Sequence, residues 1–205
     1  FKDFWIISGP FVDYTQALFF YIFGVNWQAY ILHASIINAI VTICTFVVLR
    51  NFKLNIFYSF IYSLLFSVLA YPVSGTPFVD HHSTFFSLLG IYFLMLGIKT
   101  EKTYYWILLP IFFIFAFLSK QVPASYIIIS TILVLIFYSL TQKKYTYIKY
   151  ILLSLISSIL LLFFLGNING INFSAFLEQY IFYPQSIGEK RFDNFKFTFN
   201  GVIGH

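Results

Sequence analysis

The chain has 205 residues, of which 60% are hydrophobic, 23% are aromatic and only 9% are charged. Since soluble domains carry about 25% charged residues, this composition excludes a soluble globular domain and indicates an integral membrane protein. The net charge of +5 does not indicate nucleic-acid binding, because the basic residues lie in short loops between apolar segments, where they set membrane orientation. The single cysteine, Cys44, excludes a disulfide framework and a cysteine-based metal site.

The apolar segments, taken in chain order, predict an all-α membrane protein. Residues 1–10 form an aromatic-rich outer loop, and Pro10 suits the first turn of a helix over 11–23. That helix is too short to cross a bilayer, for which ~20 residues are needed, so we expect it to lie in the membrane interface. Pro110 is expected to kink the fourth of the spans that follow. Six spans are predicted, over residues 29–49, 54–71, 82–98, 104–119, 124–141 and 149–166.

The last part of the chain, residues 167–205, is expected to be an outer tail with its own amphipathic interfacial helix. Its apolar stripe consists of Phe173, Phe176, Leu177, Tyr180 and Ile181, at helical spacing. Glu178 and Gln179 fall off that stripe, and Pro184 is expected to end the helix. We therefore predict one transmembrane domain over 1–205, with an outer segment 1–25, six spans within 29–166 and the outer tail. Because no terminal motif is visible, we interpret it as an internal piece of a longer protein.

The loops between the predicted spans differ in charge. One set carries most of the basic residues, namely Arg50, Lys53, Lys99, Lys102, Lys143, Lys144 and Lys149. The short loops of the opposite set carry Lys120 and Asp80. The positive-inside rule places the basic set in the cytoplasm, so polar chemistry is expected at the outer face.

A Pro- and Gly-broken loop, residues 71–83, precedes the third span and brings three ionisable residues together. Asp80, His81 and His82 stand where a membrane helix meets water, and ionisable groups at such a boundary indicate a functional site. The structural alternative is that Asp80 caps the helix, a position that aspartate favours. Neighbouring helical residues point ~100° apart, so the two histidines are not expected to face one ligand.

Lys120 is the only cation in the short outer loops. A lysine at a membrane boundary requires an anionic partner or must reach the headgroups, so it indicates either a phosphate-binding residue or simple snorkelling. The neighbouring Gln121 could bind the same group by hydrogen bonding.

The order of motifs along the chain resembles a known family. Phe1-Lys2-Asp3-Phe4-Trp5, Gly9-Pro10-Phe11 and Phe23-Gly24, followed by a span that Arg50 closes, resemble the polytopic glycosyltransferases of the GT-C fold. The similarity is to the bacterial branch related to protein O-mannosyltransferases and lipid A aminoarabinose transferases. Asp80 before the third span, and Lys120-Gln-Val-Pro after the fourth, also match family positions.

The resemblance implies a reaction: a sugar moves, with inversion, from a polyprenyl-phosphate carrier to a lipid, glycan or protein acceptor at the outer face of the bacterial inner membrane. It implies that the main general-base carboxylate lies upstream of the stretch matching 1–10. It places Asp80, His81 and His82 in the active site and Lys120 on the carrier phosphate. It also makes a divalent metal, Mg or Mn, a candidate cofactor, with Asp80 and His82 as candidate ligands. Membrane lipids are expected partners, and nucleic acid is not.

Other polar residues are weaker candidates. Arg191, beside Lys190, suits bidentate oxyanion binding, although such a pair in a loop is commonly only solvated. Glu178 and Tyr180 are candidates for lining the acceptor site. Asp13 lies on the first interfacial helix, and His33 is interpreted as a packed polar residue of the first span.

Two other functions compete with the glycosyltransferase. A flippase for lipid-linked sugars would carry charged or Gly/Pro-broken positions near the bilayer midplane, but apart from Pro110 the span centres are Phe, Ile and Leu. A non-catalytic membrane scaffold would not gather its carboxylates at one face. The sequence therefore favours the transferase.

Overall fold

The structure is a computed structural model, and it describes residues 9–72 and 75–194, with side chains as far as Glu189. Within these ranges the chain forms helices joined by short connections and contains no strand. The helices are α1 (Pro10–Phe23), α2 (Trp27–Asn51), α3 (Ile56–Leu69), α4 (Val79–Thr100), α5 (Thr103–Ser119), α6 (Gln121–Gln142), α7 (Thr146–Ile168), α8 (Phe173–Leu177), the π-helical turn η1 (Glu178–Phe182) and α9 (Tyr183–Asn194). They fall into two compact units, one within residues 8–161 and one that includes residues 162–194.

The predicted all-α membrane fold is confirmed. Four described helices are long and apolar enough to cross a membrane, namely α2, α4, α6 and α7, with 22 to 25 residues each. The apolar helices α3 and α5 have 14 and 17 residues, which is below the ~20 that a full crossing requires. The count of six spans therefore stays a prediction. Pro110 lies inside α5, and the helix continues through it.

Local signals set several helix ends. Asn26 caps α2, since its side chain accepts a hydrogen bond from the Ala29 amide at 2.8 Å, and Asn55 caps α3 in the same way. At the other end of α2, the Arg50 guanidinium donates to the Leu54 carbonyl at 2.6 Å. The two asparagines thus satisfy amide groups that a helix start leaves without partners, and the Arg50 bond holds the connection between α2 and α3.

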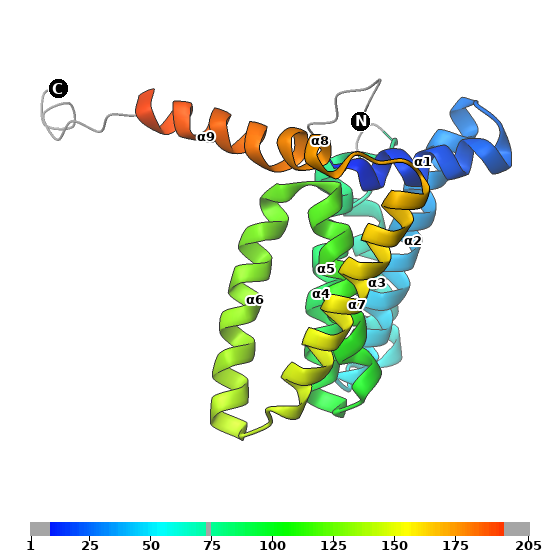
Figure 1. Ribbon diagram of the computed structural model, residues 1–205. Coiled ribbons are helices and arrows are strands. Elements are labelled where there is room, and N and C mark those ends of the chain that lie inside the picture. The colour runs from blue at the N-terminus through cyan, green and yellow to red at the C-terminus, as the bar shows by residue number, and fades with distance from the viewer. Residues whose placement is uncertain (1–8, 73–74, 195–205) are drawn as a thin grey trace, which may run out of the picture. The chain divides into compact units, whose positions relative to one another are not determined.

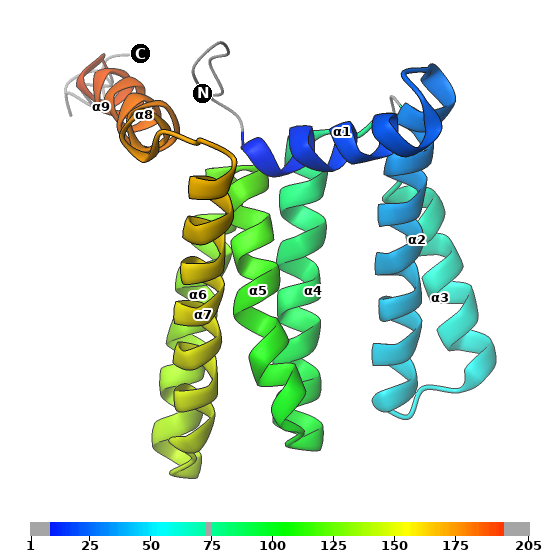
Figure 2. The same ribbon diagram turned by 45° about the vertical axis from the view of Figure 1, so that its right-hand side comes forward.

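Helix α4 is the centre of the unit formed by residues 8–161, and α2, α5 and α6 all pack against it (Figures 1 and 2). The contact with α5 is close because Gly90 has no side chain: a Cβ atom there would lie 2.7 Å from the Phe113 ring. The first core cluster combines buried residues of α2, α4, α5 and α6, namely Val41, Phe85, Phe86, Leu89, Ala116 and Ala124. Burial of apolar groups between helices thus fixes α4 on several sides.

Helix α1 lies across one end of these helices instead of running beside them, as its short length predicts (Figure 2). Its start is held against the end of α5. The Phe11 ring stacks on Phe115 with 4.6 Å between centroids and meets Phe86 edge-on at 5.3 Å. Gly9 lies so close to the carbonyls of Leu118 and Ser119 that no side chain fits there.

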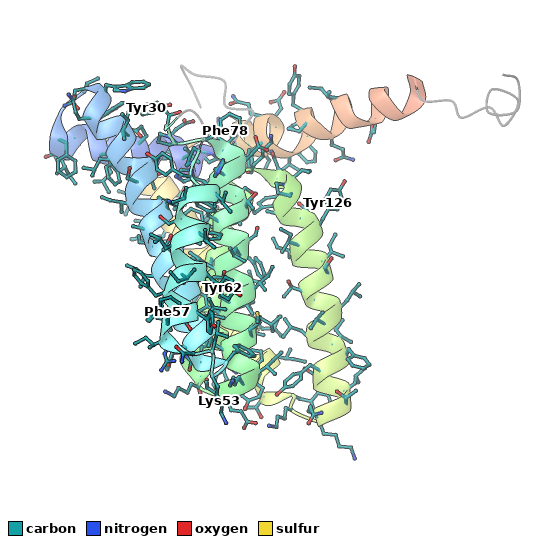
Figure 3. All side chains as sticks on the ribbon, turned by 180° about the vertical axis from the view of Figure 1, so that it is seen from behind. Tyr30, Lys53, Phe57, Tyr62, Phe78 and Tyr126 are labelled. Atoms are coloured by element: carbon teal, nitrogen blue, oxygen red, sulfur yellow. The ribbon has the colours of Figure 1, made fainter. Side chains whose placement is uncertain are left out.

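The two ends of the bundle differ in charge, as the loop pattern predicts. Figure 3 shows Phe78 at the end where α1 lies and Lys53 at the opposite end. The basic end also holds an exposed ion pair between Lys144 and Glu101, and the Tyr147 hydroxyl donates to the same carboxylate at 3.3 Å. The hydrogen bond from Lys144 lowers the pKa of the Glu101 carboxyl below its usual value.

The second unit corrects two predictions about the outer tail. Pro184 does not end the helix: it is the second residue of α9, directly after the π-helical turn η1. Tyr183 before it has helical angles (φ −65°, ψ −49°), so the chain runs helically from η1 through the proline, whose missing N–H removes one backbone hydrogen bond. Gln179 is buried, with 6% of its surface exposed, so it does not belong to a solvated face. In η1 the backbone hydrogen bonds join residues five apart instead of four. The side chains there therefore point in directions that differ from those of a regular α-helix.

Candidate functional site

The candidate site is built around the first turn of α4. Residues 80–83 are consecutive, so on a helix their side chains point in directions ~100° apart. Their partners come from three places in the chain: Lys120, in the connection between α5 and α6, bonds to both Asp80 and Ser83, while Ala70 at the end of α3 bonds to His81 and His33 of α2 bonds to His82. The position before the helix is Phe78, which makes no side-chain cap, so Asp80 is not the N-cap.

Asp80 forms an ion pair with Lys120, whose Nζ atom lies 2.6 Å from the Asp80 Oδ1 atom. The two side chains are 40% and 35% exposed. An ion pair this exposed contributes only about 0–1 kcal/mol to the free energy of unfolding. Its effect on stability therefore does little to explain why the two residues are paired here. The predicted requirement of Lys120 for an anionic partner is met within the chain.

The backbone around Lys120 explains its placement. Lys120 lies between α5 and α6 in an extended conformation, with φ −161° and ψ 137°, and Val122 near the start of α6 is extended as well, with φ −112° and ψ 127°. Its amide donates to the Ala116 carbonyl at 3.0 Å, and its own carbonyl accepts a hydrogen bond from the Ser83 hydroxyl at 3.1 Å. The Nζ atom carries three N–H groups, so the bond to Asp80 leaves two directions for an incoming anion.

The two histidines separate as the helical geometry predicts. His81 Nε2 donates to the Ala70 carbonyl at the end of α3, at 2.8 Å. His82 is 2% exposed and points inward, with Nδ1 3.1 Å from the Phe78 carbonyl oxygen. Both rings therefore have protein partners, and a catalytic role for either stays a prediction.

His82 also contacts His33, which in turn contacts Gln16. Neither contact was predicted from the sequence. His33 Nε2 of α2 lies 3.3 Å from His82 Nε2, and His33 Nδ1 lies 2.8 Å from Gln16 Oε1 of α1. His33 is 0% exposed and Gln16 is 7% exposed. His33 is a packed polar residue, as expected, but its partners lie 17 and 49 residues away in sequence. The sequence offered one weak indication of these contacts. Gln16 lies four residues after Val12, so helical spacing places both on the same, buried side of α1.

The candidate metal ligands do not fit a divalent cation. Both nitrogens of His82 have hydrogen-bond partners, and Asp80 already lies against the positive charge of Lys120. Among the described residues there is no group of three or more His, Cys, Asp or Glu side chains that could hold a metal ion.

An apolar groove of about 380 Å³ runs between α4 and α6. Its lining residues are Ile91, Leu94, Tyr126, Ile127, Ser130, Thr131 and Val134. On α6 the lining begins at Tyr126, six residues after Lys120, and on α4 it begins at Ile91, eleven residues after Asp80. The groove therefore lies farther along these two helices than the Asp80–Lys120 pair.

The remaining predicted residues are Gln121, Glu178, Tyr180 and Arg191. Gln121 is the first residue of α6, next to Lys120, and is partly buried. Glu178 is exposed in η1, and Tyr180 is fully buried there, with burial raising the pKa of its hydroxyl. Both belong to the second unit, separate from that of Asp80. Arg191 lies in α9, and its side chain, like residues 1–8, falls outside the described part.

Comparison with protein families gives a match over most of the chain. The model of the dolichyl-phosphate-mannose-protein mannosyltransferase family matches residues 8–164, which include Asp80, Lys120 and the buried histidines. The chain belongs to this family. Members are membrane glycosyltransferases that use a polyprenyl-phosphate sugar donor and protein or lipid acceptors. Comparison with curated proteins and with solved structures gave no significant match.

Asp13 of α1 provides a prediction about pH. Desolvation raises the pKa of its carboxyl above the ordinary value. The folded protein therefore binds this proton more tightly than the unfolded chain, and stability falls as pH rises from the unfolded pKa of about 3.9 through the folded pKa. Asp13→Asn should raise the melting temperature slightly at pH 7, with the gain shrinking toward pH 4. Thermal unfolding in detergent at several pH values tests this, and a lower melting temperature for Asp13→Asn at pH 7 would show that the carboxylate has a stabilising partner.

Proposed function

We propose that this protein transfers a sugar, with inversion, from a polyprenyl-phosphate carrier to a lipid, glycan or protein acceptor. The observation that carries the proposal is the Asp80–Lys120 pair, held at one end of a membrane bundle whose sequence matches a glycosyltransferase family. The basic loops at the opposite end favour the outer face of the membrane for this pair. We take the membrane to be the bacterial inner membrane, with the site on its periplasmic side.

In the proposed reaction the acceptor oxygen attacks the anomeric carbon and forms the new glycosidic bond. The bond between that carbon and the phosphate oxygen breaks, and its electron pair leaves with the polyprenyl phosphate. The acceptor proton passes to a carboxylate, which the family resemblance places upstream of the segment matching residues 1–10. None of the described residues is assigned this proton-accepting role.

Lys120 stabilises the departing phosphate. Negative charge grows on the leaving oxygen in the transition state, and a fixed cation close to it lowers the barrier. Asp80 holds the Lys120 Nζ atom through the 2.6 Å ion pair, so the cation needs little reorganisation when the donor binds. Asp80 thereby also helps to orient the phosphosugar.

The groove between α4 and α6 supports a lipid-linked donor. It is apolar, apart from the hydroxyls of Tyr126, Ser130 and Thr131, and it lies on the same two helices, α4 and α6, that begin at the Asp80–Lys120 pair. A carrier whose phosphate lies at Lys120 can place its hydrocarbon chain there, out of water.

Turnover in proteoliposomes that contain a radiolabelled polyprenyl-phosphate hexose tests the proposal. A transferase releases free polyprenyl phosphate and labels the acceptor fraction, whereas a flippase moves the intact carrier from one leaflet to the other. Transport of unaltered carrier without release of sugar would contradict the proposal.

Asp80→Asn should lower the transfer rate about 10- to 100-fold, because a neutral amide no longer fixes the lysine charge at the leaving group. The control is Glu101→Gln, which makes the same change from carboxylate to amide in the other ion pair, at the opposite end of the bundle. We expect the control to keep the wild-type rate. A folded Asp80→Asn protein with full activity would refute the assignment of Asp80.

A further inference from the structure

The buried contact between Gln16, His33 and His82 has one arrangement of protons in which both rings are neutral. The Phe78 carbonyl oxygen can only accept, so His82 Nδ1 carries a proton and donates to it. In a neutral His82 ring the Nε2 atom then accepts, and His33 Nε2–H donates across the 3.3 Å contact. His33 Nδ1 is in turn an acceptor and requires a donor from α1.

The side chain of Gln16 can supply that donor. Its Nε2 atom is buried and has no hydrogen-bond partner, while its Oε1 atom lies 2.8 Å from His33 Nδ1. Turning the amide by half a turn exchanges the two atoms, gives Nε2 a partner and removes the contact between two acceptors. The hydrogen bonds then run in one direction, from Gln16 through His33 and His82 to the Phe78 carbonyl.

The alternative arrangements place a positive charge on one of the two rings: on His33, which then donates from both nitrogens, or on His82, which then donates to His33 Nε2 and leaves His33 Nδ1–H to donate to Gln16 Oε1. His33 is fully buried, and within the described part of the chain neither ring forms an ion pair with a carboxylate. An unpaired buried charge is costly, so the neutral chain is the stable form.

We propose that His33 and Gln16 are positioning residues for the transfer reaction, acting through His82 on the first turn of α4 and hence on Asp80. The inference rests on the role proposed above for Asp80. His82 lies two residues after Asp80 and is bonded to the Phe78 carbonyl, so its ring and the backbone of that turn are linked. The His33 ring is itself held by Phe19, which stacks on it at 4.7 Å. A misplacement of ~1 Å at a reacting centre can cost about 100-fold in rate.

The first test compares two substitutions of His33. His33→Phe keeps a ring on which Phe19 can stack but removes both nitrogens, and it should lower kcat on the order of 10-fold or more. The KM for the donor should change little, because Lys120 is untouched. His33→Gln retains a donor and an acceptor and should recover most of the rate. Equal losses in the two variants would overturn the proposal.

Tyr92→Phe is the matched control for packing between α2 and α4. It removes the 2.9 Å hydrogen bond between Tyr92 and Thr45, which joins the same two helices farther along the bundle. We expect a lower melting temperature with kcat preserved. A loss of kcat as large as that of His33→Phe would show that any weakening between these helices affects turnover, and it would overturn a specific role for His33.

A double-mutant cycle with Asp80→Asn decides whether His33 acts through Asp80. If it does, His33→Phe costs little additional rate once Asp80 is already Asn, because coupled residues are not additive. The same fold-loss in both backgrounds would overturn the positioning role and leave the proposed function intact, since Asp80→Asn alone would still be slow. An Asp80→Asn protein with full activity would overturn both.

Discussion

Replacing Lys120 with alanine should lower kcat/KM for transfer about 100-fold, the size of effect seen when one preorganised charge-stabilising donor is removed. The reason is local: Lys120 is the single residue between α5 and α6, and its Nζ atom is already held by Asp80. Without the cation, charge on the departing phosphate has no such partner. The measurement is the initial rate of product formation with a labelled polyprenyl-phosphate sugar, at several donor concentrations.

Lys144→Ala is the control for this experiment. Lys144 is also an ion-paired lysine with a side chain that is 35% exposed, but it lies at the opposite end of the bundle. The two variants therefore lose the same charge and a comparable ion pair. We expect Lys144→Ala to retain the wild-type rate. A Lys120→Ala protein with an unchanged rate and unchanged donor affinity would remove the phosphate-binding role.

Exchanging the two charges distinguishes the contribution of the Asp80–Lys120 pair to stability from its contribution to the reaction. The double variant Asp80→Lys, Lys120→Asp keeps opposite charges at the same place and should keep a near-normal melting temperature. If the pair serves the reaction, transfer stays low, because the cation now projects from α4. Recovery of full activity would mean that only the existence of the ion pair matters.

The substitution Gly9→Ala should give the largest loss of stability. An added Cβ atom would lie 1.9 Å from the Leu118 carbonyl oxygen and 2.2 Å from that of Ser119. These are backbone atoms of α5, which cannot move aside as a flexible side chain does. The start of α1 must shift, which disturbs the stacking of Phe11 on Phe115. Overpacking of this kind costs about 3 kcal/mol, which corresponds to a fall in melting temperature of roughly 6–12 °C for a chain of this size.

Gly188→Ala makes the same chemical change where nothing lies within 4 Å of the added atom. Gly188 is within α9, and alanine is the better helix former by about 1 kcal/mol. We expect this control to leave the melting temperature unchanged or slightly higher. Thermal unfolding in detergent, followed by circular dichroism, compares the two variants. A Gly9→Ala protein as stable as wild type would show that α1 is not packed closely against α5.

The fold class and the helix positions are determined largely by the sequence alone. The predicted span 29–49 corresponds to α2, observed at 27–51, and the predicted span 149–166 corresponds to α7, observed at 146–168. This agreement has a physical cause, since a segment in lipid must satisfy its own backbone and must be long enough to cross the apolar layer. The position of Lys120 between two helices also follows from the order of residues.

The contacts of the candidate site were decided only by the tertiary structure. Lys120 and Asp80 are 40 residues apart in sequence, and His33 and His82 are 49 apart. A hydropathy pattern shows that a helix has an apolar surface, but most spans here are apolar on every side, so the pattern does not say which side meets which neighbour. Close approach at Gly90, the crossing of α1 and the burial of α4 select the neighbours, and with them the partners of each polar side chain.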